Sequence, residues 1–69
     1  MMSNILKNKG DKSPAEVDRL LRSQGWTIVR SNKHNVYSKT GVEKKFIVPR
    51  HKVNWKNLYD NCRRLGVAI

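Results

Sequence analysis

The segment SPAEVDRLLRSQGWTIVR, residues 13–30, decides the fold, because it contains the start of a helix, its end and the beginning of a sheet. Ser13 and Glu16 have the spacing of a capping box, in which each side chain accepts a hydrogen bond from the other residue's backbone N–H. Apolar residues then recur at helical spacing: Val17, Leu20 and Leu21. Gly25 can take the left-handed conformation that ends a helix. The segment therefore predicts a helix over about residues 14–24.

Residues with high β propensity follow this helix in three short runs. The runs are residues 26–30, 34–39 and 43–48. Ser31-Asn32-Lys33 separates the first run from the second, and Thr40-Gly41 separates the second from the third. Two successive hairpins predict a three-stranded antiparallel meander.

A second helix is predicted over residues 55–65, where apolar residues again recur at helical spacing before Gly66. Asn54 is a good N-cap, and Val53 and Leu58 can pack across it as a hydrophobic staple. The resulting order, α-β-β-β-α, defines an α+β fold with a three-stranded antiparallel sheet and two helices on one face. The other face of the sheet stays open.

We expect one domain over residues 13–69, preceded by a flexible basic arm over residues 1–12 that stays outside the core. Tyr37, rather than its neighbour Val36, is expected to face inward. The predicted core consists of Val17, Leu20, Leu21, Trp26, Ile28, Tyr37, Phe46, Val48, Trp55, Leu58, Cys62 and Leu65.

The charge of the chain points to a polyanionic partner. Fifteen Lys and Arg against five Asp and Glu give 69 residues a formal net charge of +10, and nucleic acid is the leading candidate. No apolar run approaches the roughly 18 residues that a membrane span needs, so we expect a cytoplasmic protein without a membrane partner. One cysteine and two histidines form no metal-binding signature, and no cofactor is expected.

His34 is the best candidate for chemistry, because the sequence offers few groups that exchange protons near neutral pH. No Ser-His-Asp order, carboxylate pair or Gly-rich phosphate loop occurs. Lys33 and Arg30 lie near His34, so a phosphate approaching it would meet cationic donors. In its neutral form the imidazole can take the proton of an RNA 2′-hydroxyl, and cleavage by that nucleophile needs no metal. The alternative is a half-exposed strand histidine without a role.

Further cations are candidate contacts for RNA phosphates. Arg50 and Lys52 belong to the loop over residues 49–52. The sequence is equally compatible with a loop that binds phosphate and with a solvated turn that has no ligand. Lys44 stands beside Lys45 in the third predicted strand, and alternation along a strand places at most one of them on the open face.

Four stretches carry a resemblance to a known family: LLRSQGW at 20–26, RSNKH at 30–34, FIVPRH at 46–51 and RLG at 64–66. Over about residues 13–66 the chain resembles the HicA toxins of bacterial and phage toxin–antitoxin systems. The resemblance implies a fold similar to double-stranded-RNA-binding domains and ribonuclease activity on mRNA. It also implies a HicB-type antitoxin that covers the open sheet face and the catalytic histidine, which by its place in the motif would be His34.

In that family a glycine and a serine usually precede the catalytic histidine, whereas Asn32 and Lys33 stand here. Asparagine tolerates a left-handed backbone. Lys33 could hold phosphate, or it could mark a protein that binds RNA without cutting it. Three functions therefore stay open: a metal-independent endoribonuclease toxin, a non-catalytic RNA-binding module of the same fold that a phage could encode, and a basic protein that engages an acidic host protein.

Overall fold

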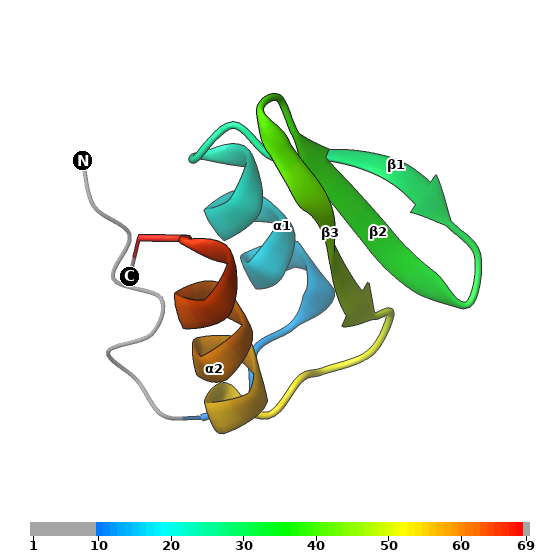
Figure 1. Ribbon diagram of the computed structural model, residues 1–69. Coiled ribbons are helices and arrows are strands. Elements are labelled where there is room, and N and C mark those ends of the chain that lie inside the picture. Colours follow the sequence, from blue (N-terminus) through cyan, green and yellow to red (C-terminus); the bar gives the residue numbers. More distant parts are fainter. Residues whose placement is uncertain (1–9, 69) are drawn as a thin grey trace.

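Two helices and three strands follow one another in the order α-β-β-β-α (Figure 1). The computed structural model describes residues 10–68. The elements are α1 (Pro14–Arg22), β1 (Thr27–Ser31), β2 (His34–Lys39), β3 (Val42–Pro49) and α2 (Trp55–Leu65). The predicted α+β class and element order are confirmed, and the predicted ends of the elements differ from these bounds by at most two residues.

The three strands form one antiparallel sheet in the order β1-β2-β3, so β1 and β3 are its edges. Tyr37 in β2 pairs with Ile28 in β1 and with Phe46 in β3, and this row of side chains packs in the core beneath the helices. The pairing register shifts between Ile28 and Arg30 and again between Tyr37 and Lys39. Such bulges bend a strand and increase its twist.

Helix α1 begins with the predicted capping box. Ser13 Oγ accepts a hydrogen bond from the Glu16 N–H at 3.2 Å, and Glu16 Oε1 accepts one from the Ser13 N–H at 3.0 Å. These hydrogen bonds hold the pKa of Glu16 below its usual value. The helix ends two residues earlier than predicted, where the Ser23 hydroxyl donates to the Leu20 carbonyl at 2.6 Å. Gly25 then reverses the chain into β1 with a φ of +90°.

Helix α2 has the predicted bounds. Asn54 Oδ1 caps it by accepting a hydrogen bond from the Lys56 N–H at 2.9 Å, and Gly66 ends it in the left-handed conformation with a φ of +75°. Val53 and Leu58, the pair expected to form the staple, are both buried. At 11 residues α2 is the longer helix, and neither helix in residues 10–68 has the length and apolar character to cross a membrane.

The core lies between the helices and the sheet, and Tyr37 faces into it as predicted. The buried residues that the sequence predicted are Val17, Leu20, Leu21, Trp26, Tyr37, Phe46, Val48, Leu58 and Cys62. Those predicted to be core but only partly buried are Ile28, Trp55 and Leu65. Val53 and Val67 are also buried, although the prediction omitted both. Each lies just outside a helix, where helical spacing gives no signal.

The chain before α1 is tied to the chain before α2. Lys12 and Val53 form an isolated antiparallel bridge in which the N–H of each donates to the carbonyl of the other at 2.9 Å. Lys12 is only 3% exposed. The prediction that residues 1–12 stay outside the core is therefore corrected at Lys12, which the bridge holds against the domain. Residues 1–9 of the predicted arm lie outside the described residues.

Candidate nucleic-acid interface

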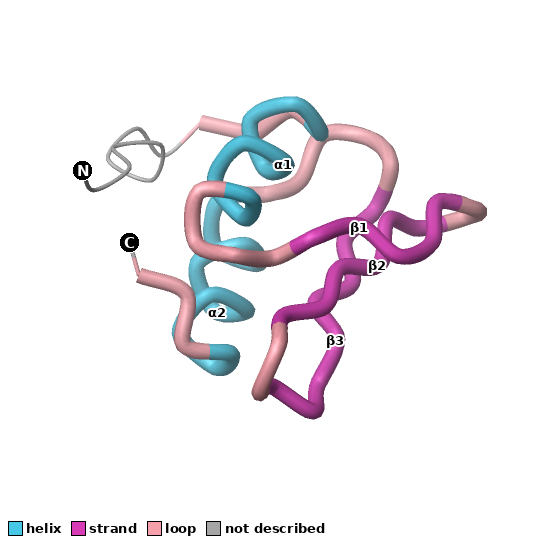
Figure 2. Tube along the Cα trace, turned by 90° about the horizontal axis from the view of Figure 1, so that it is seen from above, coloured by secondary structure: helices cyan, strands magenta, loops and turns pink. Residues whose placement is uncertain are grey.

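Both helices that the structure describes lie on one face of the sheet, and neither covers the other face. Figure 2 shows α1 and α2 on the same side of the strands, so the opposite face is uncovered. Val36 in β2 pairs with Ile47 in β3, and both point away from the row that contains Tyr37. Val29 and Ile47 are 56% and 55% exposed. The uncovered face therefore presents large apolar side chains to solvent.

His34 lies in a hollow on this face, where β2 begins. This hollow, termed the sheet hollow, has a volume of about 370 Å³ and is lined by Arg30, Asn32, Lys33, His34, Val36 and Ile47. His34 pairs with Pro49 across the sheet, which places the hollow at one end of β2 and β3. Arg30, Lys33 and His34 are all exposed. The structure thus brings together three of the residues that the sequence singled out.

The turn before His34 is held from two sides. Ser31 Oγ donates to Asn35 Oδ1 at 2.8 Å, and Arg50 Nη1 donates to the Asn32 carbonyl oxygen at 2.7 Å. Asn32 does not adopt the left-handed backbone that its side chain would tolerate, because within residues 10–68 only glycines have a positive φ. The turn therefore forms without the glycine that is usual in the HicA family.

The other predicted phosphate contacts do not gather in the sheet hollow. Arg50 reaches the edge of it through its hydrogen bond to Asn32. Lys44 lies near the other end of β3, about 16 Å along the strand from Pro49 at the usual rise per residue. Lys52 lines a separate cavity. Lys44 and Lys52 therefore lie apart from His34 and do not line the sheet hollow.

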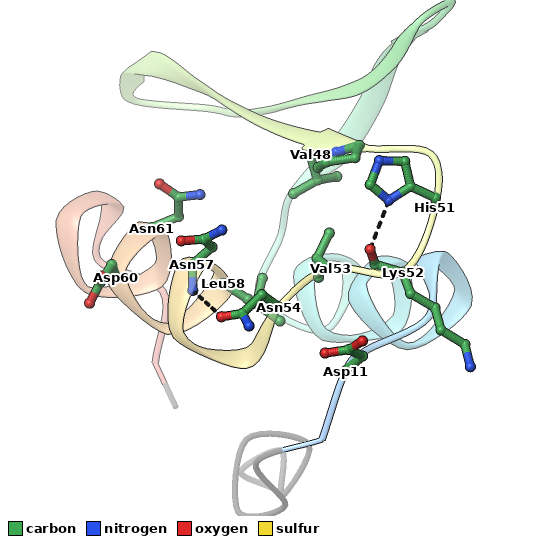
Figure 3. Close-up of a pocket in the computed structure, with 11 residues that line it drawn as sticks. Asp11, Val48, His51, Lys52, Val53, Asn54, Asn57, Leu58, Asp60 and Asn61 are labelled. Carbon is green, nitrogen blue, oxygen red and sulfur yellow. Dashed lines mark hydrogen bonds between the residues drawn. The ribbon is translucent and has the colours of Figure 1, made fainter.

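The separate cavity lies on the helix side of the end of β3 (Figure 3). This cavity, termed the helix cleft, has a volume of about 570 Å³ and is bounded by the end of β3, the loop before α2 and one side of α2. His51 and Lys52 line it together with Asn54, Asn57 and Asn61. The sequence indicated Asn54 only as an N-cap, and Asn57 and Asn61 were not among the predicted site residues. The spacing of the three asparagines could have indicated that they line one site, because residues i, i+3 and i+7 share one side of a helix.

The sheet hollow can hold a phosphodiester next to a proton acceptor. Arg30 and Lys33 supply positive charge, and a guanidinium can give two parallel N–H donors to a phosphate. Of the described residues that line the hollow, His34 supplies the imidazole, and imidazole is a common general acid or base in proteins. Within residues 10–68, no three His, Cys, Asp or Glu side chains gather as metal ligands.

Two further groups that could react are buried in the core. Burial raises the pKa of the Cys62 thiol to about 11, so the thiol stays protonated at neutral pH and is a poor nucleophile. Burial also raises the pKa of Tyr37, together with the 2.6 Å hydrogen bond that its hydroxyl donates to Asp18 Oδ1. Both side chains are structural, and Cys62 occupies the core position that the sequence predicted.

Neither a family model, nor a curated protein, nor a solved structure matches this chain. A proposal of function therefore depends on the residues of the site and on the sequence resemblance.

Proposed function

We propose that this protein is a HicA-like toxin, an endoribonuclease that cleaves mRNA in the cytoplasm without a metal ion. One observation carries the proposal: His34 is exposed beside Arg30 and Lys33, in a hollow on the uncovered face of the sheet. Cleavage of a phosphodiester needs cationic donors next to a proton acceptor. The resemblance to HicA toxins adds support, because His34 stands where that family has its catalytic histidine.

The proposed reaction begins at the RNA 2′-hydroxyl, whose oxygen attacks the adjacent phosphorus. The His34 imidazole accepts the hydroxyl proton as a general base. The bond between phosphorus and the 5′-oxygen breaks, and that oxygen takes a proton from water. The products are a 2′,3′-cyclic phosphate and a 5′-hydroxyl. Arg30 and Lys33 stabilise the additional negative charge on the phosphorus oxygens in the transition state.

A HicB-type antitoxin is the partner proposed for the uncovered face. Val29 and Ile47 expose apolar surface there, and covering such surface favours association with another protein. Ile47 also lines the sheet hollow. A protein that covers Ile47 would therefore cover His34 as well, so binding of the antitoxin would block access of RNA.

A non-catalytic RNA-binding module is the second candidate function. It is favoured by the lining of the sheet hollow, in which residues 10–68 place beside His34 no second imidazole and no carboxyl group that could protonate the leaving oxygen. The non-catalytic function is also favoured by Lys33, which stands where the HicA family usually has a serine. Such a module would hold RNA phosphates with the same cations and leave the RNA intact.

The test compares purified wild-type protein with His34→Ala on an mRNA substrate. Wild type is expected to cut the RNA and leave 2′,3′-cyclic phosphate ends, and His34→Ala should lower the rate by about 100-fold or more. Lys44→Ala, in the same sheet but away from the hollow, is the control and should cut at the wild-type rate. Equal cleavage by His34→Ala removes His34 from the mechanism, and binding of RNA by wild type without cleavage favours the non-catalytic module.

A further inference from the structure

The helix cleft combines an apolar floor with a row of carboxamides (Figure 3). Three buried side chains form the floor: Val48, Val53 and Leu58. Asn57 and Asn61 stand one turn apart on α2, and Asn54 lies at the start of that helix. Small-molecule sites are mostly apolar cavities of roughly 300–1,000 Å³ with a few placed polar groups. At about 570 Å³ the helix cleft has the size and the lining of such a site.

The asparagines retain hydrogen-bonding groups for a ligand. Asn54 Oδ1 caps α2, and Asn61 Oδ1 accepts from Arg64 Nη2 at 2.8 Å, so the amide NH₂ of each is left to donate. The carboxamide of Asn57 makes no hydrogen bond in the described part of the chain. Asn57 therefore offers a donor and an acceptor side by side, the pattern that pairs with the edge of a nucleobase, adenine above all.

His51 lies across the helix cleft from Asn57 and Asn61 (Figure 3). His51 Nδ1 is 2.8 Å from the carbonyl oxygen of Lys52. Because a carbonyl oxygen only accepts, Nδ1 is the donor in this hydrogen bond. The same hydrogen bond fixes the orientation of the ring. Unstacked RNA bases are commonly held by stacking on a flat side chain such as histidine.

The charges around the helix cleft do not suit a phosphate. Asp11 and Asp60 line it together with Lys52, and the exposed Lys56 ammonium lies 3.8 Å from the Asp60 carboxylate, so the two carboxylates offset the positive charge that would attract an anion. This is unusual in a chain whose formal net charge is +10. The sheet hollow differs, because the described residues that line it include two cations, Arg30 and Lys33, and no carboxylate. The helix cleft therefore suits a neutral, planar group that forms hydrogen bonds.

Pro49 connects the two cavities. It lines the helix cleft and pairs with His34 across the sheet, and paired residues have Cα atoms about 5 Å apart. We propose that the helix cleft binds an RNA base, from a nucleotide next to the one at His34, and thereby gives the protein its sequence preference. The inference rests on the proposed function for its RNA substrate. Single-stranded RNA can supply such a base because its bases can be splayed out of the stack.

The test uses the His34→Ala protein, which leaves RNA intact, and measures its Kd for four RNA hexamers, A6, C6, G6 and U6, at one salt concentration. The weakest and the tightest hexamer are expected to differ by about tenfold or more, as one well-placed base contact provides. Adding Asn57→Ala should reduce that difference to about twofold or less. Asn57 is exposed, and circular dichroism checks that the variant is folded. Arg63→Ala, an exposed position on the same helix that does not line the cleft, is the matched control and should keep the tenfold difference.

The outcomes separate this inference from the proposed ribonuclease. Loss of the preference in Asn57→Ala, in a protein whose wild type does not cut RNA, supports the base site and refutes the ribonuclease. Cleavage by wild type with a preference that Asn57→Ala leaves unchanged supports the ribonuclease and refutes the base site. Equal affinity for the four hexamers, or binding of none of them, also overturns the base site.

Discussion

The Arg50 guanidinium donates a 2.7 Å hydrogen bond to the carbonyl oxygen of Asn32, and so joins the end of β3 to the turn that precedes His34. Asn32 lies two residues before His34 in the chain. The contact therefore helps to fix where β2 begins and where the imidazole stands. Arg50 acts on the proposed site as a positioning residue, in addition to any contact that its remaining N–H groups make with RNA.

Arg50→Ala is predicted to lower the rate of mRNA cleavage by about tenfold or more, because small displacements of a catalytic group are costly. The free energy of unfolding should change by less than about 1 kcal/mol, since the hydrogen bond is exposed. Single-turnover cleavage and urea unfolding measure the two effects. Arg50→Lys keeps the charge but not the planar guanidinium, and should recover little of the lost rate. Full recovery by lysine would show that only charge matters at this position.

The dependence of RNA binding on salt should identify the phosphate contacts. In the His34→Ala background, Arg30→Ala and Lys33→Ala are each predicted to reduce the slope of log K against log salt by about 0.7 for single-stranded RNA. Lys44→Ala removes the same charge at a position away from the sheet hollow and should leave the slope nearly unchanged. Binding titrations at several salt concentrations give the slopes. Equal effects of all three substitutions would mean that the positive charge acts as a diffuse field without a localised phosphate site.

Cleavage is predicted to persist when divalent metal ions are removed, because the proposed reaction uses an imidazole and two cationic side chains. The measurement is the cleavage rate of dialysed protein in excess EDTA. A ribonuclease that needs Mg²⁺, assayed in parallel, shows that the chelator is effective. Loss of activity in EDTA that returns when Mg²⁺ or Mn²⁺ is added would contradict the metal-free mechanism.

The hydrogen bond from Tyr37 to Asp18 predicts a pH-dependent stability. This hydrogen bond is the main reason why the pKa of Asp18 lies below its usual value, and Arg22 lowers this pKa further. A lowered pKa in the folded state stabilises the protein above the unfolded pKa of about 3.9, and this stabilisation is lost as the pH falls through the folded pKa. Tyr37→Phe should therefore cost about 1–2 kcal/mol at pH 7 and less at pH 3.

Urea unfolding at pH 7, 5 and 3 tests this prediction. Tyr59→Phe is the matched control, because the Tyr59 hydroxyl makes no hydrogen bond in the part of the chain that the structure describes. Its effect on the free energy of unfolding should be small and the same at each pH. A cost of Tyr37→Phe that stays constant from pH 7 to pH 3 would show that the ionised Asp18 carboxylate is not what the hydroxyl stabilises.

The helices and strands were predictable because their signals are local. The capping box at Ser13, the spacing of apolar residues and the glycines at helix ends each involve residues a few positions apart. The burial of Val53 and Val67 was not predictable in this way. Val53 is held by its bridge to Lys12, far away in sequence, and the Gln24 carboxamide pairs with the Ala68 backbone next to Val67.

The candidate site was predictable only where the chain turns tightly. Arg30, Lys33 and His34 share one hollow because a short turn joins β1 to β2. Arg50 and Lys52 are two residues apart but reach opposite sides of the sheet, since side-chain alternation holds along strands and not along loops. The helix cleft is formed by Asp11, the end of β3 and α2 together, so no single stretch of sequence could reveal it.

The two bulges interrupt the edge strands of the sheet. β1 and β3 are open edges, and a regular edge beside exposed apolar residues is a template for strands of other chains. In β1, Ile28 pairs with Tyr37 and Arg30 pairs with Val36, so Val29 between them is an extra residue. In β3, the three residues 43–45 lie opposite the single residue Ser38 of β2. Each bulge shortens the straight part of its edge and twists the strand. Another strand would therefore find only short regular stretches to pair with on either edge.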